Sequence, residues 1–128
     1  MSELSANAKL SAMIDHKRID GDDFYATNIG ILKKPLNDSI SMIGSECSSC
    51  TNLASYGDNL YYGKLSSIYR YDLARNSEIQ LLSGNSNVNC ACVPQGIPLF
   101  GYSNNRMGYM LNGSWNPISE FGNRFHAQ

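Results

Sequence analysis

A repeat anchored on three glycines constrains the fold of this chain more than any other feature of its sequence. Gly21, Gly57 and Gly96 lie 36 and 39 residues apart. An apolar and an aromatic residue stand at the third and fourth positions past each glycine, in the pairs Phe24-Tyr25, Leu60-Tyr61 and Leu99-Phe100. A period of about 38 residues predicts a repeated supersecondary unit rather than one irregular domain.

Each repeat contains four short apolar runs separated by polar turns. In the middle repeat these runs are 50-CTNLASY-56, 60-LYYGK-64, 68-IYRYDL-73 and 79-IQLL-82. Their aromatic and β-branched residues suit the pleated, half-buried surface of a β-sheet. In the last repeat, Asn112-Gly113 is a two-residue hairpin signal, because both turn positions need a positive φ. We predict strands near residues 22–26, 59–63, 67–73, 78–82 and 97–101.

The N-terminal segment differs from the repeats. Its apolar residues recur at mixed helical spacings, and Ser2 is a suitable cap for the start of a helix. We therefore predict a short helix or arm over residues 1–12. Residues 13–128 are predicted to form a single β-repeat domain, with repeats near 13–46, 47–86 and 87–123.

The middle repeat, 57-GDNLYYGKLSSIYRYDL-73, resembles the blades of tyrosine-rich β-propeller families in which the pattern GD-aromatic-YY…IYR-DL recurs. The resemblance spans about residues 12–121, although the first copy has Pro35 where the second has Asp72 and the third is shortened around Asn112-Gly113. It implies an all-β, propeller-like fold of about three four-stranded blades. Blades of this kind host unrelated activities, so the resemblance implies no function. A β-sandwich with evenly spaced strands is the alternative.

Three blades are fewer than a closed propeller contains, since propellers close with about 4–8 blades. An open arc leaves one face of each end blade without a partner, and exposed apolar faces of this size mark interaction sites. We therefore predict protein partners, either further copies of the chain or other subunits of an assembly. The predicted interface residues are Leu4, Leu10, Met13, Ile14, Trp115, Phe121 and Phe125.

The four cysteines form two close pairs, 47-CSSC-50 and 90-CAC-92. Cys50 and Cys90 precede their repeat glycines by seven and six residues, so adjacent repeats would bring the pairs together. We predict that Cys47 or Cys50 lies close to Cys90 or Cys92. Four buried thiols, two disulfides and a tetrahedral zinc site remain open, and no cofactor other than zinc is considered.

No catalytic signature is present in the sequence. His16 and His126 belong to no metal or triad motif, and there is no GxSxG elbow or phosphate-binding glycine loop. Asp20, Asp22 and Asp23 lack the remainder of a calcium loop and are typical of a turn. We therefore expect no enzymatic activity.

The sequence carries no strong nucleic-acid signal and no membrane span. Ten Lys and Arg residues face eleven Asp and Glu residues, and no basic patch suited to displacing counterions is visible. No apolar stretch approaches the roughly 20 residues that cross a bilayer. At the N-terminus the basic residues follow the apolar ones, the reverse of a signal peptide. We expect a protein made in the cytoplasm, with a virion as a further destination.

Two functions are compatible with these features. The first is a non-catalytic structural or interaction subunit of a multi-protein assembly, with a bacteriophage or other virion as the leading case. The second is a lectin-like module, acting as an oligomeric propeller, that binds glycans between blades through aromatic faces and polar neighbours. The residues predicted for glycan binding are Tyr62, Tyr69, Tyr71, Tyr102, Tyr109 and Trp115.

Overall fold

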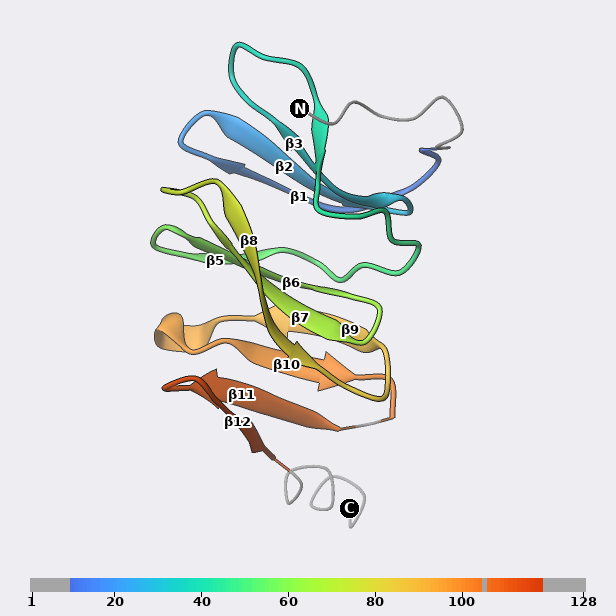
Figure 1. Cartoon of the computed structure of the whole chain (residues 1–128), viewed down its shortest axis with the longest axis vertical. Helices are drawn as coiled ribbons and strands as arrows, with labels where there is room; N and C mark the ends of the chain where they lie inside the picture. Colours follow the sequence, from blue (N-terminus) through green and yellow to red (C-terminus); the bar gives the residue numbers. More distant parts are fainter. Residues whose placement is uncertain (1–9, 105, 119–128) are drawn as a thin grey trace.

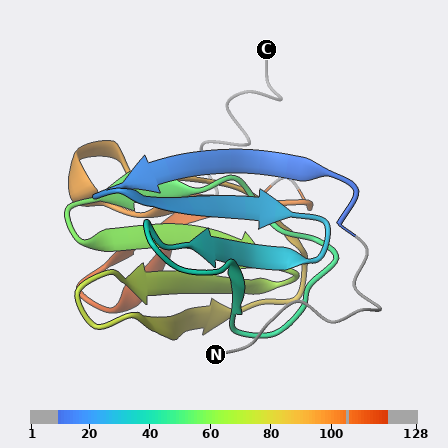
Figure 2. The same ribbon diagram turned by 90° about the horizontal axis from the view of Figure 1, so that it is seen from above.

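A computed structural model describes residues 10–104 and 106–118 of the chain. Within this part, the chain forms twelve strands and one short 3-10 turn. The strands make three four-stranded antiparallel sheets that lie one above another (Figure 1), and the sheets overlap when the molecule is viewed from above (Figure 2). The predicted all-β fold of three blade-like repeats is confirmed. Residues 1–9, which include most of the predicted helix or arm, lie outside the described residues.

The first sheet contains β1 (Met13–Ile19), β2 (Asp22–Thr27), β3 (Gly30–Lys34) and β4 (Ser41–Ile43), paired in that order. The second sheet repeats this order with β5 (Ala54–Tyr56), β6 (Asn59–Lys64), β7 (Ser67–Asp72) and β8 (Ser77–Ser83). Consecutive strands pair in both sheets, so each sheet is a simple meander made from one repeat.

The third sheet contains β9 (Val88–Cys92), β10 (Leu99–Tyr102), β11 (Met107–Leu111) and β12 (Ser114–Pro117), with the 3-10 turn η1 (Pro94–Gly96) between its first two strands. The β11–β12 turn has positive φ at both Asn112 and Gly113, at 53° and 77°. The hairpin predicted from this dipeptide is therefore confirmed.

The repeat glycines all lie between the first and second strands of their sheets, but not in the same register. Gly21 is the second residue of the two-residue β1–β2 turn, whereas Gly57 is the first residue of the β5–β6 turn. Counting from the turns therefore matches Phe24 with Tyr61 and not with Leu60. A one-residue shift moves a strand side chain to the opposite face. The equivalence of Phe24 and Leu60 expected from the glycine spacing is therefore wrong.

Two apolar clusters fill the spaces between the sheets. The cluster between the first and second sheets, termed the first junction, contains Phe24, Ala26, Ile31, Ile43, Leu53, Leu60, Tyr62 and Tyr71. The cluster between the second and third sheets, termed the second junction, contains Ala54, Tyr61, Ile68, Val88, Ala91, Phe100 and Met110. Each sheet thus contributes alternate residues to a junction, and the second sheet is covered on both faces.

Candidate binding site

Three of the tyrosines predicted to bind glycans lie in the first junction. Tyr62 is fully buried and its hydroxyl donates to the Glu78 carboxylate at 2.6 Å. Burial and this carboxylate raise the Tyr62 pKa, so the phenol stays neutral and acts as a donor. Tyr69 stacks on Tyr62 with ring centroids 6.0 Å apart, and Tyr71 is also buried. These rings are core side chains, because the two sheets cover their faces.

A buried ion pair completes this side of the first junction. Lys64, only 4% exposed, lies with its Nζ 2.9 Å from a Glu78 oxygen and 4.7 Å from the centre of the Tyr69 ring. The ammonium also donates to the Ile43 carbonyl of the first sheet at 3.4 Å. A Cβ on Gly44 would collide with the Glu78 carboxylate, so the loop after β4 packs directly on the pair. The charges at this position are paired within the chain.

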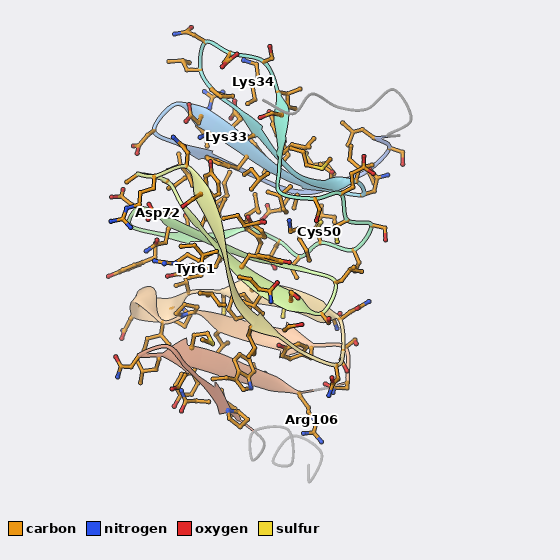
Figure 3. All side chains as sticks on the ribbon, viewed as in Figure 1. Lys33, Lys34, Cys50, Tyr61, Asp72 and Arg106 are labelled. Carbon is orange, nitrogen blue, oxygen red and sulfur yellow. The ribbon has the colours of Figure 1, made fainter. Side chains whose placement is uncertain are left out.

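Two of the other three predicted aromatic residues, Tyr102 and Trp115, line a groove at one end of the second junction. Tyr102 and Trp115 meet edge to face with ring centroids 5.7 Å apart, on neighbouring parts of the third sheet. They line a groove of ≈ 550 Å³ together with Asn85, Asn104 and Arg106. Figure 3 shows Arg106 at the edge of the third sheet, beside this end of the stack. The sixth predicted residue, Tyr109, pairs with Leu99 and Asn116 outside this groove.

The loop before β9 shapes one wall of the groove. Gly84 lies against the Tyr102 ring, where a Cβ would come within 3.2 Å of its atoms. Burial raises the pKa of Tyr102, which keeps its hydroxyl protonated at neutral pH. The groove therefore combines aromatic surface with amide and guanidinium donors at its rim.

A second hollow lies on the outer face of the first sheet, the face turned away from the second sheet. It measures ≈ 330 Å³ and is lined mainly by Leu10, Met13, Tyr25, Leu32 and Ile40. Leu10 and Met13 are 49% and 60% exposed, so this hollow has an apolar, solvent-exposed rim. We call this surface the first outer face.

The remaining predicted interface residues are distributed differently. Ile14 is 49% exposed on β1. Trp115 is partly buried and packs against the second junction. Leu4, Phe121 and Phe125 lie outside the described residues.

The cysteines are free thiols in two separate settings. Cys50 packs against the first junction and its thiol lies against the Cys47 carbonyl at 3.7 Å, while burial and the neighbouring Cys47 raise its pKa to about 12. Cys90 and Cys92 are both exposed on β9. The backbone segments do approach, since the Asn52 side chain makes two hydrogen bonds to Ala91. Among the described residues, no three His, Cys, Asp or Glu side chains are grouped as a metal site requires.

Sequence reasoning missed a second pocket in the second junction, at the end opposite the Tyr102 groove. This pocket, of ≈ 360 Å³, lies between the β11–β12 turn and the segment after η1, with Tyr61 and Arg70 of the second sheet on one side. The available signal was the position of Arg70 in 68-IYRYDL-73. Alternation along a strand places Arg70 on the same face as the buried Ile68.

Comparison with known proteins supports the fold. No family model and no curated protein matches the chain. Its structure is similar to YCF48 from Cyanidioschyzon merolae, a β-propeller, with a TM-score of 0.64 and 9% identity over 84% of this chain and 37% of that one. It also matches the computationally designed Ika8 protein, with a TM-score of 0.49 and 13% identity over 88% of this chain and 49% of that one. The chain thus spans less than half the length of each of these two proteins.

The likeness to YCF48 establishes a propeller-type fold and nothing further, because the identity is low. The described part of the chain contains no helix long and apolar enough to cross a membrane.

Proposed function

We propose that this chain is a non-catalytic interaction module that supplies three blades of a larger β-propeller, with a second copy of the chain supplying the others. The observation that carries the proposal is the first outer face. Tyr25 is the fourth residue of β2 and Tyr62 is the fourth residue of β6, so the two occupy equivalent positions in their sheets. Tyr62 packs into the junction between its own sheet and the preceding one. The first sheet therefore presents apolar side chains on the face where the second sheet receives its neighbour.

The outer face of the third sheet is the surface proposed to fill this position. Its strands carry Leu99 and Tyr109 on the side away from the second junction, because their strand neighbours Phe100 and Met110 point into it. Two copies that exchange these contacts would close a ring of six blades, within the usual range of about 4–8. A two-fold arrangement of this kind is the commonest closed symmetry of soluble proteins.

Charge placed on the first outer face tests the proposal. We expect wild-type protein to show twice the 14.1 kDa chain mass by light scattering, and Met13→Glu to run as a monomer with unchanged β-sheet circular dichroism. Leu65→Glu is the matched control, because Leu65 is 49% exposed and lies in the β6–β7 turn of the second sheet. Deletion of residues 2–12 should weaken the dimer in the same way. A wild-type chain that stays monomeric at every accessible concentration would contradict the proposal.

The composition extends the proposal to a larger particle. A nearly neutral chain with many Asn and Ser residues suits a structural subunit of a bacteriophage or other virion, which is the assembly we propose to test first. Co-purification of tagged chain with particles from the native source supports this assignment. Recovery of the chain free of any particle counts against it and leaves the dimer proposal intact.

Glycan binding is the second candidate, and the Tyr102 groove favours it. The edge-to-face pair of Tyr102 and Trp115 offers aromatic surface to a sugar ring, with Asn104 and Arg106 at the rim as hydrogen-bonding partners. Glycan-array binding that is lost in Arg106→Ala and kept in Lys34→Ala supports this function. Lys34 is a suitable control, because it lies on the first sheet (Figure 3).

A further inference from the structure

The second junction contains a cation that no partner within the described chain neutralises. Arg70 lies on β7 between its cross-strand neighbours Tyr61 and Ile79. Its one hydrogen bond to a described residue runs from Nη1 to the Asn59 side-chain oxygen at 3.4 Å, which is long. Its Nε is buried and has no acceptor in the described residues. A buried guanidinium N–H without an acceptor is uncommon, so this group is a candidate contact for a ligand.

The nearest acid on the same strand face is already engaged. Asp72 lies two residues beyond Arg70, and one of its carboxylate oxygens accepts the backbone N–H groups of Ala74 and Arg75 at 3.0 and 3.2 Å. No carboxylate of the described residues lies within ion-pair distance of Arg70. This contrasts with Lys64, whose charge Glu78 balances at 2.9 Å.

A second donor faces the same pocket. Tyr61 pairs directly with Arg70 across the β6–β7 ladder, and Figure 3 shows it on the side of the second sheet toward the third. No hydrogen bond within the described chain engages its hydroxyl. Burial raises the Tyr61 pKa, so the phenol is protonated at neutral pH and can donate.

The opposite wall of the pocket is apolar. Ile97, Pro98, Met110 and Leu111 line it, and the exposed fractions of Ile97 and Leu111, 37% and 45%, place them at the mouth. At ≈ 360 Å³ the pocket lies at the small end of the range for ligand sites. It therefore suits a small ligand with one polar end and one apolar end.

We propose that this pocket binds a carboxylate that carries a small apolar group. The guanidinium fork, through Nε and a terminal nitrogen, matches the two oxygens of a carboxylate, and the Tyr61 hydroxyl supplies one further donor. The apolar group lies against Ile97, Pro98 and Leu111. A phosphate dianion fits less well, because Arg70 is the single cationic side chain among the residues that line the pocket. The ligand is either a free carboxylic acid or the C-terminus of a peptide that ends in an apolar residue.

Titration followed by nuclear magnetic resonance tests the site in the full chain. The probes are 3-methylbutanoate and an acetyl-Gly-Gly-Leu peptide, with 3-methylbutanol and the C-terminally amidated peptide as neutral controls. We expect a saturable shift of the Arg70 Nε–H resonance and of the Gly113 amide with both carboxylates, and none with the neutral controls. The carboxylate that saturates at the lower concentration identifies the source. Equal responses to the neutral controls, or no saturable response to either carboxylate, would overturn the proposal.

Variants separate the two donors. Arg70→Lys keeps the charge but loses the fork, and we expect it to weaken binding at least about tenfold. Tyr61→Phe keeps the ring but loses the hydroxyl, and should weaken binding about tenfold, as the loss of a hydrogen bond to a charged group does. Tyr102→Phe, at the other end of the junction, is the matched control and should leave binding unchanged. If Arg70→Lys does not fold, Tyr61→Phe still decides, because unaltered affinity in that variant would contradict the assigned contact.

Discussion

The two junctions of this stack join sheets of the same strand arrangement, but they differ in how their buried polar groups are paired. In the first junction, Lys64 and Glu78 form a buried pair that the Tyr62 hydroxyl completes. In the second junction the main polar link is the Asn52 side chain, which bonds to both backbone groups of Ala91. Arg70, which lies on β7 of the second sheet, has no counterion among the described residues.

The first junction is held in one packing arrangement by its buried ion pair, whereas the second junction has open ends that can accept a ligand. Buried charges cost desolvation energy unless they are paired, so the first junction is tied to one relative placement of its sheets. The second junction is apolar at its centre and open at both ends, where it forms the Tyr102 groove and the Arg70 pocket. Binding sites in this chain are therefore expected at the second junction and on the outer faces.

The largest expected effect comes from emptying the centre of the second junction. Phe100 is fully buried there, and Phe100→Ala should destabilise the chain by about 4 kcal/mol, as removal of a core aromatic ring usually does. Leu99→Ala, one residue earlier and on the other face of the strand, is the control and should cost about 1 kcal/mol. Urea unfolding followed by circular dichroism measures both. Equal losses would contradict the assignment of the two faces.

Breaking the buried pair of the first junction should have the next largest effect. Lys64→Met leaves the Glu78 carboxylate, 16% exposed, without its cation, and we expect a loss of about 3 kcal/mol. The double variant Lys64→Met with Glu78→Gln should recover part of this loss, because the amide oxygen still accepts from Tyr62. Lys34→Met, which removes a lysine without a carboxylate partner in the described chain, should stay within about 0.5 kcal/mol of wild type. Urea midpoints rank the three proteins. A double variant less stable than Lys64→Met would show that the pair is not the source of the effect.

Sequence alone was sufficient for the strands and their grouping. Runs such as 68-IYRYDL-73 combine β-forming residues with alternation, and Asn112-Gly113 requires a hairpin. The register between repeats could not be predicted in the same way. A turn with glycine first and a turn with glycine second have nearly identical sequence spacing, yet they place Phe24 and Leu60 on opposite faces of their sheets.

The candidate sites were less predictable than the fold, because they depend on contacts between sheets. Tyr62 and Tyr102 look alike as strand tyrosines, but the first is covered by the first sheet and the second lines a groove. The Lys64–Glu78 pair joins β6 to β8, and Lys and Glu are residue types that are usually exposed, so the sequence did not indicate that they are buried. Alternation along β7 could have placed Arg70 on the buried face. Its lack of a counterion in the described chain could not be predicted, because it depends on which third-sheet side chains face Arg70, and these are uncharged.

The smallest expected effect concerns an ion pair in the opposite setting, on the first outer face. Asp23 bonds to Arg18 and to His16 at 3.0 and 2.8 Å, and these bonds, the one to Arg18 foremost, lower its pKa from 3.8 to about 2. Because the pKa is lower in the folded chain, the pair contributes stability that is complete above pH 3.8 and is lost as the pH falls toward 2. The contribution should be slight, since Arg18 is 68% exposed.

Asp23→Asn removes this titration and should flatten the pH dependence of the urea midpoint between about pH 4 and pH 2, while changing little at neutral pH. Asp38→Asn is the control, because that carboxylate accepts only the N–H of Ser39 among the described residues. It should leave the pH dependence as in wild type. If Asp23→Asn and wild type lose stability in parallel over this interval, the exposed pair contributes nothing measurable. The buried pair of the first junction would then be the only ion pair of the two that stabilises the stack.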